Sequence, residues 1–404
     1  MARILEHHAK QMFSQAGIPV PEGYPAVSSD QAATIAEGMD GPVVIKALVP
    51  VGKRGEAGAI QFAEDSRGAS MAATDLIGRY IGAYMIDTVL VEERIEIESE
   101  LYLSIIIDRD ERKPRIVLSA NGGVSIEQVA RENPEAIVTD TISMSRGLPE
   151  YRARELWAQA GITGPVIPKL GEITHRLWNL FVQHDLRLIE INPLFHTPDN
   201  TIIAGDAVMS VDDSAGFRHP ELARFTVPGT DRSWRPMTEL EADAQRVHEL
   251  DPYRGSARYL ELDGGNIGFL CGGGGASLLL YDHLIQAGGQ PANYAEIGGN
   301  PTERKVAGMT RVVLSKPGVE GLFVAHNITN NTQTDVIARG VVTGIQHSGR
   351  DPSTIPVVAR EAGLHDEEGR KIFESAGIHY FGEDTTLAEA AHQMVLAMTS
   401  GGSR

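Results

Sequence analysis

Apolar residues recur along the first half of the chain in segments with either a helical or a strand period. A helix is expected over residues 5–16, because Gly17 and the prolines at 19 and 21 cannot continue it. Two later apolar segments are divided by the charged residues 108–111, which is typical of a hairpin with a polar tip. The predicted segments are helices at 5–16 and 70–80 and strands at 42–49, 88–93, 100–109 and 113–120.

The pattern changes from Gly265 onwards. Four successive units each contain an apolar strand, a turn with glycine or asparagine, and an amphipathic helix. Strands that alternate with helices of this length predict a parallel sheet covered on both faces, so we expect a flavodoxin-like, doubly wound domain over residues 259–404. Residues 231–258 are polar with scattered apolar positions and predict a linker. A first α/β domain would then occupy residues 1–230.

Composition and charge narrow the class of protein. The 404 residues suit two to three domains, and the net charge of −18 opposes binding to nucleic acid or to an anionic membrane. Cys271 is the only cysteine, so an intramolecular disulfide is excluded and a cysteine metal site is disfavoured. The N-terminus lacks the pattern of a signal peptide, and no apolar stretch approaches transmembrane length. We therefore expect a cytoplasmic protein.

Candidate chemistry centres on Glu190, Asn192 and Asp206. Glu190 and Asn192 are two residues apart on a predicted strand and therefore face the same way, and Asp206 returns on the next strand. Two carboxylates and an amide offer the hard oxygen ligands that Mg²⁺ prefers. This grouping predicts a magnesium–nucleotide site, in which Glu190 could serve simply as a further metal ligand.

A glycine-rich basic loop follows the strand that ends near Lys46. Backbone N–H groups in such a loop can approach phosphate closely, while Lys46, Lys53 and Arg54 supply positive charge beside Gly55. An exposed basic turn is the alternative. Two glutamates further along, Glu92 and Glu100, could hold ribose hydroxyls, although a solvated surface face is the commoner role for a glutamate.

Together these segments resemble the ATP-grasp fold, and more narrowly the β subunit of succinyl-CoA synthetase (ADP- or GDP-forming). The resemblance extends over nearly the whole chain. It rests on EHHAKQMFSQAGIPVP at 6–21, KRGEAG at 53–58, LVEERIEIESELYL at 90–103, NGGVSIEQVA at 121–130, EINPL at 190–194, GFRHPEL at 216–222, LDGGNIG at 262–268 and GGQPANYAEIGG at 288–299.

The resemblance implies an ATP-grasp domain followed by the flavodoxin-like domain, and it assigns roles to individual residues. Mg²⁺ would be held by Asn192 and Asp206, and Glu190 would orient a phosphohistidine during phosphoryl transfer. The nucleotide, ATP or GTP, would be held by Lys46, Arg54, Gly55, Glu92 and Glu100, with Lys53 in the same loop.

The resemblance also implies a partner chain. Family members form the phosphohistidine on a Gly-His-Ala-Gly loop, and none of the 13 histidines here has that setting, His326 and His347 included. We therefore expect an α-type subunit that carries the histidine and most of the CoA site, in a heterodimer or heterotetramer. The implied reaction converts an acid, CoA and ATP or GTP into acyl-CoA, nucleoside diphosphate and phosphate.

The glycine run at 272–275 follows a strand and opens a helix. It lacks the GxGxxG spacing of a dinucleotide fingerprint, so we interpret it as a tight strand-to-helix turn at the subunit contact, with Cys271 beside it as a small buried residue.

The main departure from the family lies in the loop Asn330, Asn331, Thr332, Gln333 and Thr334, where succinyl-CoA synthetases have a glycine-rich loop. It is somewhat similar to the citrate-holding loop of ATP citrate lyase and citryl-CoA synthetase. Amide and hydroxyl groups beside a helix start suit an acid with extra oxygens, such as malate, citrate or sulfoacetate.

Other interpretations of the chain stay open. The polar loop could be helix capping in an ordinary succinyl-CoA synthetase. The chain could instead be a stand-alone ATP-grasp carboxylate-amine ligase or a regulatory nucleotide-binding subunit.

Overall fold

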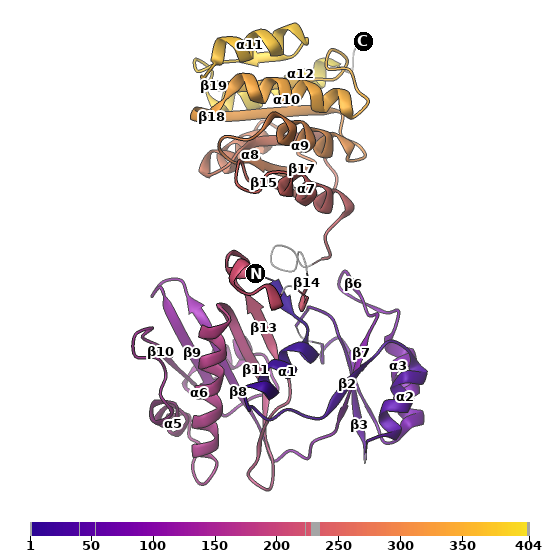
Figure 1. Ribbon diagram of the computed structural model, residues 1–404, viewed down its shortest axis with the longest axis vertical. Helices are drawn as coiled ribbons and strands as arrows, with labels where there is room; N and C mark the ends of the chain where they lie inside the picture. The colour runs from indigo at the N-terminus through magenta and orange to yellow at the C-terminus, as the bar shows by residue number, and fades with distance from the viewer. Residues whose placement is uncertain (1, 40, 53, 223, 228–234, 402–404) are drawn as a thin grey trace. The chain divides into compact units, whose positions relative to one another are not determined.

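The computed structural model describes residues 2–39, 41–52, 54–222, 224–227 and 235–401. The chain divides into two compact units, Met1–Pro236 and Met237–Arg404 (Figure 1). Each unit is described by itself. Among the described residues, no helix is both long and apolar enough to cross a membrane.

The smaller sheet of unit 1 is antiparallel, with the order β2-β7-β3-β4. Helices α2 and α3 cover one of its faces through alanines, which allow close approach (Figure 1). The elements are β2 (Gly23–Ala26), α2 (Ser29–Glu37), β3 (Val43–Ala47), β4 (Ile60–Ala63), α3 (Ser66–Leu76), β5 (Tyr80–Ile81), β6 (Tyr84–Met85) and β7 (Val89–Glu93).

The helix predicted at 70–80 lies earlier in the chain than expected. Asp65 caps α3 by accepting a hydrogen bond from the backbone N–H of Gly68, and the helix ends at Leu76. Residues 80–81 already belong to the short strand β5. The sequence pattern missed the start because Ser66, Arg67 and Gly68 are polar or small and carry no apolar signal.

The larger sheet of unit 1 has, within the described residues, the order β10-β9-β8-β11-β13-β1-β14, with β12 paired to β11. The predicted hairpin is confirmed as β8 and β9, and the predicted first helix as α1. The elements are β1 (Ala2–Ile4), α1 (Glu6–Gln15), β8 (Ser99–Asp108), β9 (Lys113–Ser119), α4 (Ile126–Glu132), the 3₁₀ turn η1 (Pro134–Ala136), β10 (Ile137–Thr141), α5 (Glu150–Gln159), α6 (Ile167–Gln183), β11 (Leu186–His196), β12 (Ile202–Ala204), β13 (Val208–Val211), the 3₁₀ turns η2 (Asp213–Arg218) and η3 (Pro220–Leu222), and β14 (Thr226–Val227).

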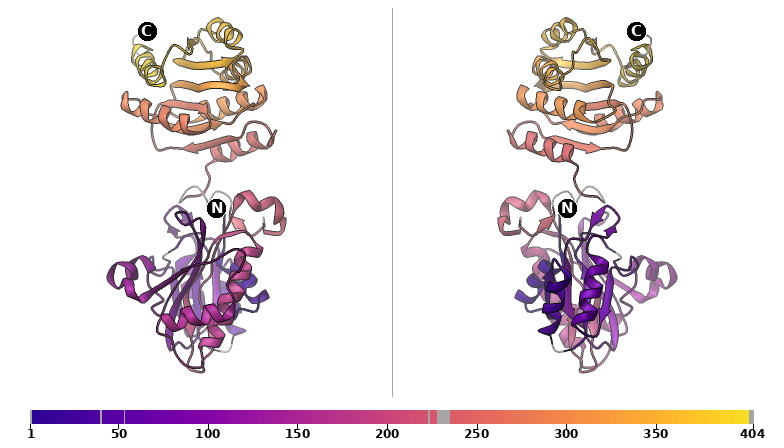
Figure 2. Two further views of the ribbon diagram at one scale, coloured as in Figure 1. Left: turned by 90° about the vertical axis from the view of Figure 1, so that its left-hand side faces the viewer. Right: turned by 90° about the vertical axis from the view of Figure 1, so that its right-hand side faces the viewer.

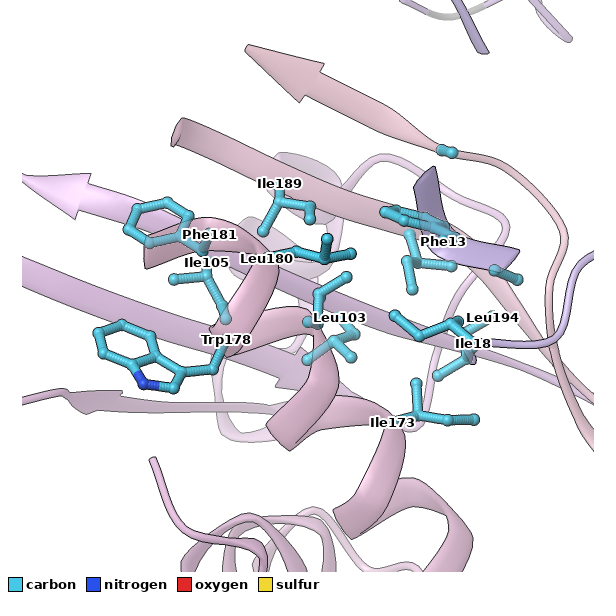
Figure 3. Close-up of a cluster of buried hydrophobic side chains, with 14 of the residues drawn as sticks. Phe13, Ile18, Leu103, Ile105, Ile173, Trp178, Leu180, Phe181, Ile189 and Leu194 are labelled. Carbon is cyan, nitrogen blue, oxygen red and sulfur yellow. The ribbon is translucent and has the colours of Figure 1, made fainter. Parts of the chain in front are cut away.

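Helix α6 closes the core of this sheet. Its apolar stripe, which includes Ile173 and Leu180, packs against Leu103 of β8 and Ile189 of β11 (Figure 3). This packing holds β8 and β11 side by side over an extensive antiparallel register. Side chains on the opposite face of these two strands are thereby fixed in position.

Unit 2 contains one six-stranded sheet within the described residues, in the order β15-β17-β16-β18-β19-β20. All neighbours are parallel except β15, which is antiparallel to β17. Its elements are α7 (Glu239–Glu249), β15 (Ala257–Glu261), β16 (Ile267–Gly272), α8 (Gly275–Gln286), β17 (Asn293–Ile297), α9 (Glu303–Ser315), β18 (Gly321–Gln333), α10 (Thr334–His347), β19 (Val357–Leu364), α11 (Asp366–Ser375), β20 (His379–Phe381) and α12 (Leu387–Gly401).

Helices cover both faces of this sheet, as Figure 2 shows with the sheet seen from its side. One core lies under α8 and α12, and the other under α7, α9, α10 and α11. The parallel strands in the order β17-β16-β18-β19-β20 form the flavodoxin-like, doubly wound arrangement. The predicted fold class is therefore confirmed.

The linker predicted at 231–258 differs from what the structure shows. The units divide between Pro236 and Met237, and α7 fills much of the expected linker. A capping box between Thr238 and Glu241 starts this helix. Its buried face holds the charged Glu241 beside the small residues Ala244 and Val247, which is why the apolar pattern was too weak to predict it.

Candidate functional site

One cavity of about 1640 Å³ lies in unit 1 and is lined by residues of both sheets. It brings together residues that the sequence scatters over 160 positions. The predicted site residues that line it are Lys46, Arg54, Gly55, Glu92, Glu100, Glu190, Asn192 and Asp206. Lys53, which was predicted to bind the nucleotide, lies outside the described residues.

A buried ionic network forms one wall of the cavity. The Lys46 ammonium lies 2.7 Å from Glu92 and 3.2 Å from Glu6, and it donates a hydrogen bond to the carbonyl of Gly205. Lys10 contacts the same three groups, at 2.5 Å from Glu92 and 2.9 Å from Glu6. Although burial opposes the charge, Glu6 and Glu92 keep the pKa of Lys46 above its ordinary value. Glu92 therefore serves in this structure to hold two lysines.

Arg54 links this network to the predicted metal ligand Asp206. Its guanidinium lies 2.8 Å from the Asp206 carboxylate and 2.5 Å from Glu6, and it also donates to the carbonyl of Ala47. Burial opposes ionisation of Glu6, but Arg54, Lys10 and Lys46 hold the pKa of Glu6 well below its ordinary value. The carboxylates Glu6, Glu92 and Asp206 thus balance the charges of these cations.

Sequence reasoning missed Glu6 and Lys10, both of which lie on α1. The helix buries them on the same face as Ala9 and Phe13, where an amphipathic helix ordinarily has apolar residues. Two opposite charges four residues apart on an apolar face were the available signal. Glu92, the second partner of Lys10, is however 82 positions away and could not be assigned from the pattern.

Glu190 projects from β11 into the cavity beside Tyr102 of β8. The Tyr102 hydroxyl lies 2.8 Å from the Glu190 carboxylate and 3.0 Å from the Ser104 hydroxyl. Because a carboxylate is the stronger acceptor, the tyrosine donates its proton to Glu190 and the serine donates to the tyrosine. Burial raises the pKa of Glu190 despite this bond, and the charges of Asp206 and Glu127 raise it further. Tyr102 was not predicted from the sequence.

Asn192 is held by the loop between β9 and α4. Its side-chain oxygen accepts a hydrogen bond from the N–H of Gly123 at 2.8 Å, and its amide group donates to the carbonyl of Val124 at 3.0 Å. The Asn192–Pro193 peptide bond is cis. The carboxylates of Glu190 and Asp206 line the same cavity, so the donor set is composed of hard oxygen atoms and fits Mg²⁺.

The predicted acid loop lies in unit 2, where β18 passes into α10. The pairing of β18 with β19 shifts register between Thr329 and Gln333, so Asn330 and Asn331 bulge out and are exposed. Thr332 is buried, and its hydroxyl accepts a hydrogen bond from the backbone N–H of Asn300.

These side chains do not cap α10. Its N-cap is Gln333, and in the described part of the chain that side chain makes no capping hydrogen bond. Helix capping by Gln333 therefore does not explain the polar loop.

A buried pair lies beneath this region. The Nδ1 atom of His326 is 2.8 Å from the Glu361 carboxylate, and both side chains are almost fully buried. The ring fits because Gly272 has no Cβ, which would come within 2.5 Å of the His326 ring. His326 and Cys271 are core residues, and His347 is on the surface, as predicted.

Comparison with known proteins places this architecture in a family. Residues 3–196 match the family described as ATP-grasp domain, and residues 238–396 match the family described as ATP citrate lyase citrate-binding. Over 397 residues the chain is 36% identical to the succinate–CoA ligase [ADP-forming] subunit beta of Chloroflexus aurantiacus, with 98% of each chain covered. The corresponding subunit of Halobacterium salinarum is 37% identical over 371 residues, with 92% of each chain covered.

The chain belongs to the ADP-forming succinate–CoA ligase β-subunit family. The predicted family, the enzyme class of acid–thiol ligases and the need for an α-type partner in a two-subunit ligase are thereby confirmed.

The overall fold is also shared with a solved relative outside the succinate–CoA ligase family. ATP citrate lyase from Methanothrix soehngenii, in complex with citrate and coenzyme A, superposes with a TM-score of 0.78 over 98% of this chain and 99% of that one. The sequences are only 18% identical, so the likeness establishes the fold alone.

Proposed function

We propose that this chain is the nucleotide-binding β subunit of an ADP-forming acid–CoA ligase that transfers phosphate from ATP to a histidine of its α-type partner. The phosphate then passes to a carboxylic acid, and CoA displaces it to give acyl-CoA. The observation that supports this proposal is the convergence of the predicted nucleotide, metal and catalytic residues on one cavity.

In this proposal the cavity wall neutralises the phosphates. Lys46 and Arg54 donate to phosphate oxygens, and Asp206, now paired with Arg54, becomes a metal ligand together with Asn192. Bound Mg²⁺ supplies charge neutralisation on the transferring phosphoryl group. Gly55 lets the loop backbone approach the phosphates, and Glu100 lines the cavity for the ribose.

Glu190 would receive the partner's histidine. A carboxylate that accepts a hydrogen bond from one imidazole nitrogen fixes the tautomer and leaves the other nitrogen nucleophilic. The assembly required is a heterodimer or heterotetramer in which the partner supplies the phosphorylated histidine and most of the CoA site.

Succinate is our first candidate for the acid, because relatives that match almost the whole chain carry that name. A second candidate is a more oxygenated short acid, such as malate, citrate or sulfoacetate. It is favoured by the polar bulge at Asn330, Asn331 and Thr332. In the described part of the chain the next residue, Gln333, does not cap α10 with its side chain, so capping does not account for this polarity. The match of residues 238–396 to a citrate-binding family points the same way.

The test is ADP release by the chain copurified with its partner, with Mg²⁺, CoA and ATP, across succinate, malate, citrate and sulfoacetate. Activity confined to succinate selects the first candidate, and activity with another acid selects the second. Glu190→Gln should abolish phosphorylation of the partner while nucleotide still binds. Glu111→Gln, at the exposed turn between β8 and β9, is the matched control. Full phosphorylation with Glu190→Gln would refute the role of Glu190.

A further inference from the structure

A second cluster of metal-ligating side chains lies in unit 1, at the turn between α6 and β11. His184 ends α6, and His219 and Glu221 lie on the 3₁₀ segment after β13. One ligand atom from each of these residues lies within 4.8 Å of the others. Within the described part of the chain, none of these side chains lines the nucleotide cavity.

The hydrogen bonding of His219 leaves a lone pair facing this cluster. Its Nε2 atom is 2.7 Å from the Asp185 carboxylate, and as the donor of that bond it carries the proton. With Nε2 as the donor, Nδ1 is the nitrogen whose lone pair can bind a metal ion, and it lies 3.5 Å from the Glu221 carboxylate, which can only accept. Two acceptors at this distance repel each other unless a cation or a proton lies between them.

One ring nitrogen of His184 adds a third ligand atom to the same cluster. Its Nδ1 atom is buried and, among the described residues, has no hydrogen-bond partner. The two imidazole rings have centroids 5.8 Å apart and are tilted by 58°, so they do not stack.

We propose that His184, His219 and Glu221 form a site for a borderline transition-metal ion of the Zn²⁺ class, with water as the fourth ligand. Tetrahedral bonds of about 2.0–2.1 Å place neighbouring ligand atoms about 3.4 Å apart, close to the separation between His219 and Glu221. Two imidazoles select against Mg²⁺, which prefers oxygen ligands.

Asp185 takes the position of the carboxylate that orients a metal-bound histidine. It accepts from the ring nitrogen of His219 that faces away from the proposed ion, which fixes the tautomer needed for binding. Arg218 lies 3.0 Å from the same carboxylate oxygen and restrains it. Bound metal would join the end of α6 to the segment that carries Leu222 into the core of unit 1.

The test is Zn²⁺ binding to the metal-free full-length chain, with saturating Mg²⁺ and ATP present to occupy the nucleotide cavity. Equilibrium dialysis should find one more bound Zn²⁺ per chain in the wild type than in His184→Asn or Glu221→Gln. Glu221 is half exposed, so its variant should fold normally. The exposed His347→Asn is the matched control. Asp185→Asn should retain the site but weaken it by about 10- to 100-fold.

Two further readouts do not depend on activity. Co²⁺ should give the visible absorption of a tetrahedral site in the wild type but not in His184→Asn. At a hundredfold excess over the dissociation constant, Zn²⁺ should raise the Tm of unit 1 by about 5–10 °C. Equal Zn²⁺ stoichiometry in the wild type and His184→Asn would refute the site, and would indicate that a second proton on His219 satisfies Glu221.

Discussion

Removing the hydroxyl of Tyr102 tests how the surroundings of Glu190 affect its function, because the Glu190 carboxylate itself is left in place. In Tyr102→Phe, the Glu190 carboxylate loses a 2.8 Å hydrogen bond from a buried donor. A hydrogen bond to a charged group contributes about 1.5–3 kcal/mol, so we expect phosphoryl transfer to the partner to slow by about 10- to 100-fold. The ring stays, so the apolar packing of Tyr102 is kept.

The same variant should also change how the rate of phosphoryl transfer depends on pH, in a direction that follows from the pKa of Glu190. Burial raises the pKa of Glu190, and the bond from Tyr102 opposes that rise. Without the bond the pKa rises further, so a larger fraction of Glu190 is protonated at a given pH. The acidic limb of the pH–rate profile should therefore move to higher pH.

The assay is partner phosphorylation by radiolabelled ATP under single-turnover conditions across a pH series. The matched control is Tyr24→Phe, because Tyr24 donates to Glu22 at 3.0 Å but is exposed, and its loss should change nothing. A profile for Tyr102→Phe that coincides with the wild type in both rate and acidic limb would show that Tyr102 does not tune Glu190.

Three further predictions follow from contacts in the two units. Gly272→Ala should destabilise unit 2 by about 1–3 kcal/mol in denaturant unfolding, since the added Cβ would come within 2.5 Å of the His326 ring. Gly275→Ala is the control and should be tolerated, because a Cβ at this position would meet no described atom within 4 Å. Glu6→Gln should destabilise unit 1 by about 3–5 kcal/mol, because it leaves buried cations without their partner. The pKa of Glu6 is depressed in the folded state, so the ionised carboxylate contributes to the stability of unit 1 above the unfolded pKa of about 4.3. This contribution is lost as the pH falls through the folded pKa. Stability should therefore fall less steeply with acid in the variant than in the wild type. Thr332→Val should cost about 1–3 kcal/mol by removing the acceptor of a backbone N–H, and it should raise the KM for the acid if the bulge binds it; an unchanged KM would confine the residue to structure.

The sequence was sufficient for features that are local in the chain. Glu190 and Asn192 share a strand, and their alternation predicts that they face the same way. The repeat of strand, turn and helix after Gly265 predicted the parallel sheet because each unit carries its own apolar signal. The tight turn at 272–275 followed from glycines alone, and Gly274 has the positive φ that favours glycine.

Long-range pairings could not be predicted in the same way. Tyr102 is 88 positions from Glu190, and their contact depends on the antiparallel register between β8 and β11. A tyrosine inside an apolar strand looks like any other core residue. Helix α7 was missed for a different reason: its buried face combines the charged Glu241 with the small residues Ala244 and Val247, so it produces no clear apolar period.

In the proposed nucleotide site, the ionic network of the cavity would couple the binding of the metal to the binding of the phosphates. Arg54 is bound to both Glu6 and Asp206, so an anion that took Arg54 alone would leave the Asp206 carboxylate beside it unpaired. In the proposed complex, a divalent cation would give Asp206 a new partner when a phosphate binds Arg54. Because the wall is already balanced, a bound Mg²⁺ would offset part of the negative charge that the phosphates bring, whereas the nucleotide by itself would leave a larger negative excess. In the same proposed complex, Lys10 would keep Glu6 and Glu92 paired when Lys46 binds the phosphates.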